Sequence, residues 1–221
     1  MEFSTLPGQP ASNSRLRLAQ GLVLLFHVTG FVGLAFSRDP GFYLRYTPLT
    51  LLLTAGLLVA FQPGRTGLFW LFCAQVFLIG FAAEFVGVQT GKLFGSYSYG
   101  DTLGPKWVDV PWLIGLNWVV LTYLAGMLAA YLPVPWWVRV LVGALLMIGF
   151  DLCLEPVAGR LDFWQWAGHV IPLKNFRDWF LLSLVTQLLF ARGGFVKSNQ
   201  LAPFVYLVQL LFFFGLGWLL R

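Results

Sequence analysis

Seven apolar runs, separated by short segments rich in proline or charge, limit the folds that this chain can adopt. A helix that crosses a bilayer needs about 20 mostly apolar residues. Five runs reach or approach that length: Leu18–Phe36, Leu68–Val88, Trp112–Tyr131, Trp136–Leu154 and Pro203–Leu220. Two shorter runs, 46–61 and 176–190, would need helical extensions at their ends. The sequence predicts an all-α polytopic integral membrane helix bundle with about seven transmembrane helices, or six as the alternative.

Composition supports the membrane class. Of the 221 residues, 58% are hydrophobic and 10% are charged, whereas soluble domains carry about 25% charged residues. We expect one transmembrane domain over residues 1–221, with a polar N-terminal tail at 1–15. The formal charge of +5 is dispersed, so no nucleic-acid surface is predicted.

The connections between the runs are short except for two, Gln89–Pro111 and Glu155–Asn175. Both are rich in Trp, Tyr, Phe and Gly, and the prolines are expected to fall between the helices. With seven spans, both long loops emerge on the same face. Six basic residues fall on the N-terminal face and eight on the long-loop face, which is too even a division to orient the chain by the positive-inside rule.

Polar residues converge on the leaflet below the two loops. Glu84 lies about one turn before a predicted helix end, and Asp151 and Glu155 are four residues apart, hence on one helical face. The neighbouring polar residues are Asn117, Asn175 and Asp178. The acids could instead pair with Lys92, Arg160 or Lys174 and hold the loops, and Asn175 and Asp178 could cap a helix. Intramembrane ionisable residues in such a cluster favour a functional site.

Two like charges on adjacent turns in an apolar setting favour a neutral state for one of them, as a general acid requires. Asp151 and Glu155 meet this condition, and His27 is expected to be a hydrogen-bonded structural residue. No spacing resembles a metal site, and no glycine-rich phosphate loop is present. The chemistry predicted from the residues therefore uses carboxylic acids and no metal.

The two long loops resemble each other weakly. Glu84 is followed after six residues by "GKLFGSYSY", and Asp151 after seven by "GRLDFWQW". Each opens Gly-basic-Leu, continues with aromatic residues, and ends at proline before a helix. An internal duplication of a helix–loop–helix unit would explain this pattern.

At these loops the sequence resembles the membrane carotenoid biosynthesis proteins typified by the CruF-type carotenoid hydratases. The stretches that carry the resemblance are "TGKLFGSYSYGDTLGPKWVDVPW", "DLCLEPVAGRLDFWQW" and "IPLKNFRDW". Matches to the first family element are Thr90, Gly91, Phe94, Gly95, Tyr97, Tyr99, Leu103, Gly104, Pro105, Val110 and Pro111. Matches to the second are Asp151, Pro156, Trp164, Trp166, Pro172, Asn175, Phe176 and Trp179. The departures are Leu93, Asp109, Glu155 and Asp178. The two added aspartates, Asp109 and Asp178, indicate a divergent subgroup, so the resemblance does not fix the exact substrate.

The resemblance implies a cofactor-independent carotenoid 1,2-hydratase, a hydro-lyase that adds water across the terminal C1–C2 double bond of an acyclic carotenoid end. The expected partners are the lipophilic carotenoid, water, membrane lipids and other carotenoid biosynthesis enzymes, in a bacterial or archaeal cell membrane. In this hypothesis Asp151 or Glu155 donates the proton, and Glu84 is the base or orients the water. Aromatic faces for the cation would come from Tyr97, Tyr99, Trp112, Trp118, Trp164 and Trp166, with Trp179 from the matched motif; Asn117 or Asn175 would help to orient the water.

Three alternatives remain open at this stage. A membrane lycopene-type cyclase would protonate a similar end and close a ring. A proton-coupled transporter would use the acids as a relay, although it is expected to place polar residues at the bilayer midplane. A structural subunit of a larger complex would carry out no chemistry.

Overall fold

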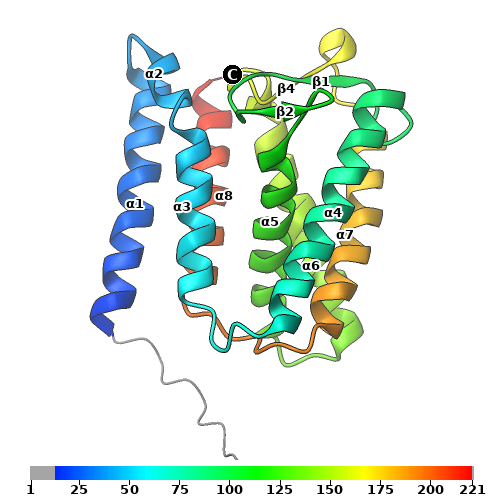
Figure 1. Ribbon diagram of the computed structural model, residues 1–221. Coiled ribbons are helices and arrows are strands. Elements are labelled where there is room, and N and C mark those ends of the chain that lie inside the picture. Colours follow the sequence, from blue (N-terminus) through cyan, green and yellow to red (C-terminus); the bar gives the residue numbers. More distant parts are fainter. Residues whose placement is uncertain (1–12, 221) are drawn as a thin grey trace, which may run out of the picture.

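The computed structural model describes residues 13–220, and within them seven long helices run side by side (Figure 1). These are α1 (Asn13–Phe36), α3 (Thr47–Ala60), α4 (Gly67–Thr90), α5 (Trp112–Ala130), α6 (Trp136–Ala158), α7 (Leu173–Arg192) and α8 (Ala202–Leu219). A short helix, α2 (Pro40–Leu44), joins α1 to α3. The predicted all-α membrane bundle is confirmed, and most of the predicted polar tail lies outside the described residues.

Six segments are long and apolar enough to cross a membrane: α1, Pro40–Ala60, α4, α5, α6 and α8. The remaining long helix, α7, lies alongside α4 and α6 in Figure 1. Its first two turns contain Lys174, Asn175, Arg177 and Asp178, so its apolar stretch is shorter than its 20 residues. This explains why both seven and six were reasonable predictions from the sequence.

One predicted helix limit is wrong. Pro156 was expected to lie between helices, but it lies inside α6, which continues to Ala158. A proline in the last turn of a helix removes only one backbone hydrogen bond and already has a helical φ. The second connection is correspondingly shorter than predicted, because Glu155 and Asn175 both lie in helices.

The helix ends follow local chemistry. The Thr66 side chain accepts a hydrogen bond from the Phe69 amide at the start of α4, and Gly91 ends that helix in the left-handed conformation. Pro111, Pro135 and Pro172 precede α5, α6 and α7. Each proline has a fixed φ and no amide hydrogen, which suits the first position outside a helix.

Helix α5 is the centre of the bundle, and 72% of its apolar stretch is buried inside the protein. It packs on α4, α6, α7 and α8, while α1 packs on α8 at the edge. Glycines allow α5 to pack closely on α4 and α7. A Cβ at Gly80 of α4 would lie 2.4 Å from the Trp118 ring, and one at Gly126 of α5 would lie 2.6 Å from the Phe190 ring.

Both long connections lie at one end of the bundle, as predicted, together with α2 and the C-terminus (Figure 1). They are tied together by an antiparallel pair, β1 (Tyr97–Tyr99) and β4 (Trp164–Trp166). Tyr97 is opposite Trp166 and Tyr99 is opposite Trp164. The two related loops therefore occupy matching places: one follows α4 and precedes α5, and the other follows α6 and precedes α7.

A second antiparallel pair, β2 (Lys106–Trp107) and β3 (Val110–Pro111), forms a hairpin just before α5. Its two turn residues, Val108 and Asp109, have φ values of 47° and 67°. Positive φ at both positions is the geometry of a tight two-residue hairpin turn. A short 3₁₀ helix, η1 (Ala167–His169), follows β4.

Candidate active site

The paired strands β1 and β4 present aromatic rings toward the helices. Side chains alternate between the two faces of a strand, so Tyr97 and Tyr99 share one face and Trp164 and Trp166 share the corresponding face of the partner strand. The alternating residues Ser98 and Gln165 are exposed. Four hydrogen-bonding rings thus lie directly above the ends of α4 and α6.

Glu84 of α4 is buried beneath these rings and accepts three hydrogen bonds. The hydroxyl groups of Tyr97 and Tyr99 donate to its Oε2 at 2.5 Å and 2.7 Å. The indole Nε1 of Trp118, on α5, donates to its Oε1 at 2.9 Å. Three donors around one buried carboxyl group provide the partners that an ionised carboxylate needs in an apolar surrounding.

The tyrosines remain protonated in this arrangement. Burial, followed by the proximity of Glu84, raises the pKa of Tyr97 and of Tyr99 well above the usual value near 10. Both phenols therefore keep their hydrogen atoms at physiological pH and act as donors to Glu84.

Glu155 of α6 has a matching set of donors from the second loop. Trp166 Nε1 donates to its Oε2 at 2.8 Å, and Trp164 Nε1 donates to the same oxygen at 3.3 Å. The third donor is the side-chain amide of Asn175, on α7, at 2.9 Å from Oε1. Each loop therefore supplies two ring donors to the glutamate on the helix that precedes it.

Asp151 lies one turn deeper on the same face of α6. The Asn175 amide, which binds Glu155, also donates to Asp151 Oδ2 at 3.1 Å. Within residues 13–220, no hydrogen-bond partner contacts the buried Oδ1 atom of Asp151. One oxygen of this carboxyl group is therefore available for a further interaction, and Asn175 bridges the two acids.

The ion pairs considered from the sequence do not hold these acids. Among the described residues, Glu84, Asp151 and Glu155 form no salt bridge; their partners are the tyrosines, tryptophans and Asn175 given above. Lys174 instead pairs with Asp178.

Asp178 has a structural role. It accepts hydrogen bonds from the Phe94 amide at 3.0 Å and from Arg177 Nε at 2.9 Å, in addition to the pair with Lys174. Asp178 thus fastens the first loop to α7, and neither it nor Asn175 is the N-cap of that helix.

Trp118 and Trp179 stack between the two halves of the cluster, with ring centroids 4.1 Å apart and planes inclined by 19°. Trp118 comes from α5 and Trp179 from α7, and each lies seven residues after the proline that precedes its helix. The stack joins the Glu84 side of the cluster to the Glu155 side.

A small polar cavity lies among these groups. It offers about 10 Å³ to the centre of a water-sized sphere, which is about the space of one water molecule. Its walls include the carboxyl-bearing side chains Glu84 and Glu155 but not Asp151. The other wall residues are Phe94, Tyr97, Tyr99, Ile114, Trp164, Trp166, Asn175 and Trp179. We call this space the polar cavity.

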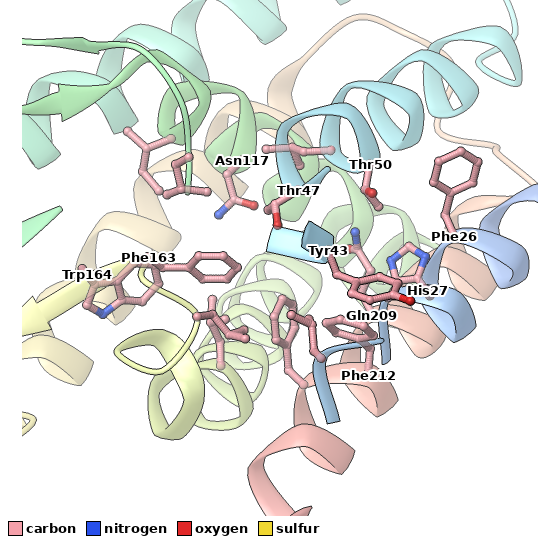
Figure 2. Close-up of a pocket in the computed structure, with 18 residues that line it drawn as sticks. Phe26, His27, Tyr43, Thr47, Thr50, Asn117, Phe163, Trp164, Gln209 and Phe212 are labelled. Atoms are coloured by element: carbon pink, nitrogen blue, oxygen red, sulfur yellow. The ribbon is translucent and has the colours of Figure 1, made fainter. Parts of the chain in front are cut away.

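A larger apolar space, here called the chamber, lies next to it (Figure 2). It offers about 120 Å³ by the same measure and is formed by α1, α2, α3, α5, α6 and α8 with the loop residues Leu103, Phe163 and Trp164. Ile114 and Trp164 belong to the walls of both spaces. A molecule held in the chamber would therefore lie one side chain away from the two glutamates.

Four predicted site residues do not border the polar cavity. Asp151 and Trp118 still belong to the hydrogen-bonded acid cluster, whereas Asn117 and Trp112 lie outside it. Asn117 is in the chamber wall, where Figure 2 shows it near Thr47. Trp112 is 49% exposed and stacks on Phe81, with centroids 5.1 Å apart, outside both spaces. Substrate binding by Trp112 and Asn117 stays a prediction.

Sequence reasoning missed most of the chamber. Its wall includes Tyr43, Thr47, Gln209 and Phe212, together with His27. The Nδ1 atom of His27 lies 2.8 Å from the Val23 carbonyl oxygen, so the expected structural bond is present, yet the ring also borders the chamber. The only signals in the sequence were single polar residues, such as His27 and Gln209, inside apolar runs.

Within the part of the chain that the structure describes, no group of three or more His, Cys, Asp or Glu side chains is arranged to hold a metal ion.

Comparison with known proteins gives one informative relative. The chain is 31% identical over 142 residues to a bisanhydrobacterioruberin hydratase of Haloarcula japonica, over 58% of this chain and 48% of that protein. The chain thus spans about half the length of this relative. No solved structure matches the chain. The carotenoid biosynthesis protein family matches residues 46–220, which contain the acid cluster and both loops. The chain therefore belongs to the carotenoid biosynthesis protein family.

Proposed function

We propose that the chain is a carotenoid hydratase that adds water across the terminal C1–C2 double bond of an acyclic carotenoid end and forms a tertiary alcohol. The named activity of the Haloarcula relative supports this proposal. The observation that carries it is the polar cavity: two carboxyl-bearing side chains border a space for about one water molecule, next to an apolar chamber.

The chemistry divides between the two glutamates. Glu155, in its protonated form, would transfer its proton to C2 of the alkene, leaving a tertiary cation at C1. The water oxygen then bonds to C1, and a proton of that water passes to Glu84. Return of this proton to Glu155 completes the cycle. One alkene and one water give one alcohol with no net change in oxidation state, so the reaction requires no redox cofactor.

Glu155 is a better candidate donor than Asp151 because it borders the polar cavity. Asp151 lies behind it, on the far side of the shared Asn175 amide. Two carboxyl groups joined through one amide in a dry site disfavour two negative charges. We therefore assign Asp151 the role of keeping Glu155 protonated, and Asn175 the role of orienting the Glu155 carboxyl group.

The aromatic walls suit the cationic intermediate. Tyr97, Trp164, Trp166 and Trp179 border the polar cavity, and a ring face stabilises a cation by about 0.5–2 kcal/mol. The same rings exclude bulk water, so the one water held by the glutamates would be the nucleophile.

The carotenoid would enter the chamber sideways from the membrane, between helices. A carotenoid dissolves in the lipid phase, and the chamber is lined by Phe, Leu and Ile side chains from helices at the edge of the bundle. Its reacting end would pass between Ile114 and Trp164. The cell membrane, where other carotenoid biosynthesis enzymes would share the lipid-dissolved substrate, is the location that we propose.

The test is expression in cells that accumulate an open-ended carotenoid, with mass analysis of the pigments. The expected product is heavier by the mass of one water for each end that reacts. Glu155→Gln and Glu84→Gln should each lower its formation by about 100-fold or more, because each removes an acid or base from the chemical step. Asp109→Asn, an exposed acid-to-amide change on the same face, is the matched control and should form product normally.

Two results would contradict the proposal. A product with a new ring and no added oxygen would identify a cyclase instead. Normal hydration by both glutamate variants would exclude the assigned roles of Glu84 and Glu155.

A further inference from the structure

Charge is segregated along the bundle axis. The chain has nine acidic residues; Glu2 lies outside the described residues, and the other eight lie in the half that carries the long loops. They are Asp39, Glu84, Asp101, Asp109, Asp151, Glu155, Asp162 and Asp178. The opposite end carries Arg15, Arg17, Arg65, Arg139, Arg192 and Lys197, with no acidic side chain among the described residues. Its positive charge is therefore not neutralised within the described part of the chain.

A basic cavity lies at this end between α5, α6 and α7. It offers about 50 Å³ to the centre of a water-sized sphere, several times the space of the polar cavity. Arg139, Lys197 and Gln187 are its polar wall residues, and small side chains of α5 and α7 leave the room. Trp136, also in the wall, is 51% exposed, as expected for an indole at the membrane interface.

Among the described residues, no salt bridge reaches Arg139 or Lys197, the two cations of this basic cavity. The Nε atom of Arg139 is buried and has no hydrogen-bond partner within residues 13–220. The Lys197 ammonium donates to the Gly193 carbonyl at 2.6 Å and lies 5.0 Å from the centroid of the Phe195 ring. Burial lowers the pKa of Lys197, a cost that a bound anion would offset.

The protein surface next to the basic cavity is suited to bind a lipid. Exposed apolar side chains on the outer faces of α6 and α7, including Trp137, Leu141 and Leu188, continue from it toward the middle of the bundle. A headgroup in the cavity would therefore have its acyl chains along these faces. An arginine guanidinium can also donate two parallel hydrogen bonds to phosphate oxygens.

We propose that the basic cavity binds the phosphate of an anionic phospholipid, held by Arg139 and Lys197. This site is at the opposite end of the bundle from the acid cluster, and its occupation does not depend on the proposed reaction. Basic cavities between transmembrane helices are suited to such headgroups. The site would also place the acid-free end in a leaflet that contains anionic lipid.

The test is native mass spectrometry of the purified protein titrated with phosphatidylglycerol or with phosphatidylcholine. The full chain should retain one phosphatidylglycerol more tightly than any phosphatidylcholine. The double variant Arg139→Gln/Lys197→Gln should bind that lipid at least about tenfold more weakly, since it loses two charge-assisted contacts. The matched control Arg15→Gln/Arg17→Gln, which removes the same charge from the same end, should retain it.

A second variant covers the case in which the double change prevents folding. Arg139→Lys keeps the charge but loses the forked donor, and should weaken phosphatidylglycerol binding by several-fold. An equal loss of phosphatidylglycerol binding in Arg139→Gln/Lys197→Gln and in Arg15→Gln/Arg17→Gln would overturn the proposal. It would show that the lipid is held by the overall positive charge of this end and not by the cavity. Equal retention of the two lipids, or displacement of the bound lipid by inorganic phosphate, would overturn it as well.

Discussion

At the residue scale, the two glutamates share a coordination pattern but differ in the chemistry of their donors. Glu84 accepts from two phenols and one indole, whereas Glu155 accepts from two indoles and one amide. A phenol oxygen can accept a hydrogen bond as well as donate one, while an indole N–H can only donate. The Glu84 side is therefore better suited to handle a water proton, and the Glu155 side is better suited to fix one carboxyl geometry.

The contribution of an indole N–H to Glu155 can be measured with Trp166→Phe. This change keeps an aromatic ring but removes the donor 2.8 Å from Oε2. In the proposed reaction Glu155 becomes charged as it gives up its proton, and a hydrogen bond to a charged group contributes about 1.5–3 kcal/mol. We therefore expect hydration to slow by about tenfold or more, measured as product formed per enzyme. Trp70→Phe is the control, since Trp70 is half exposed and lies outside both spaces, and it should hydrate at a normal rate. An equal loss in Trp70→Phe and Trp166→Phe would show that the bond to Glu155 is not what matters.

The different positions of Trp112 and Trp118 show what residue patterns can and cannot predict. The depth of each ring follows from its distance to the helix end, and both were predicted near the loops. The direction in which each ring points follows from helical rotation. Trp112 and Trp118 are six residues apart, which corresponds to about 240° around the helix axis, so the two rings face different sides of α5. The rotation of α5 relative to its neighbours is set by packing in three dimensions, which no single run reveals.

At the scale of elements, the β1–β4 pair converts two separate loops into one lid over the acids. Gly100 follows β1, and its amide donates to the Phe163 carbonyl at 3.0 Å. A Cβ at this position would lie 2.2 Å from the Asp162 carboxylate and 2.3 Å from its backbone oxygen. The close approach of the two strands therefore requires glycine here.

We predict that Gly100→Ala pushes β1 and β4 apart. Overpacking of this kind costs about 1–3 kcal/mol, and the rings that bind Glu84 and Glu155 would shift with their strands. Thermal unfolding in detergent should show a lower midpoint, and hydration should fall. Gly149→Ala, in α6 with no atom within 4 Å of the added Cβ, should leave both unchanged or raise stability slightly. An unaltered midpoint in Gly100→Ala would mean that the strands can separate without cost.

The strands themselves were not predicted from the sequence. Three-residue strands leave no usable periodicity, and the repeated Gly-basic-Leu pattern suggested related loops without indicating that they pair. The position of Pro156 inside α6 was missed because proline usually marks a helix end, whereas α6 continues to Ala158. The long helices, by contrast, follow directly from apolar length.

At the scale of the whole molecule, the chamber depends on helices from both ends of the chain. Residues 26–34 of α1 and 209–213 of α8 meet residues of α3, α5 and α6 around it. Such a space could not be predicted from local patterns, because its residues are hydrophobic in the way that lipid-facing residues also are. The acid cluster was more predictable, because its members are polar exceptions at one depth.

Filling the chamber tests whether it holds the substrate. A Cβ at Gly30 would meet only the Phe212 ring, at 3.6 Å, so Gly30→Leu should fold and place its side chain in the chamber. We expect product formation to fall roughly tenfold or more, because a displaced alkene no longer meets the donor. Gly21→Leu, in the same helix with nothing within 4 Å, should be fully active. Normal hydration in Gly30→Leu would place the substrate elsewhere.

The size of the polar cavity sets an order of events. Because it has space for about one water molecule, we predict that in the proposed reaction the water that becomes the alcohol oxygen enters before the carotenoid does. A protein equilibrated in ordinary water and then mixed with substrate in heavy-oxygen water would release its first alcohol unlabelled, provided that exchange with bulk water is slower than the chemistry. Later molecules would carry the label, so the isotope in each product would record which turnover made it.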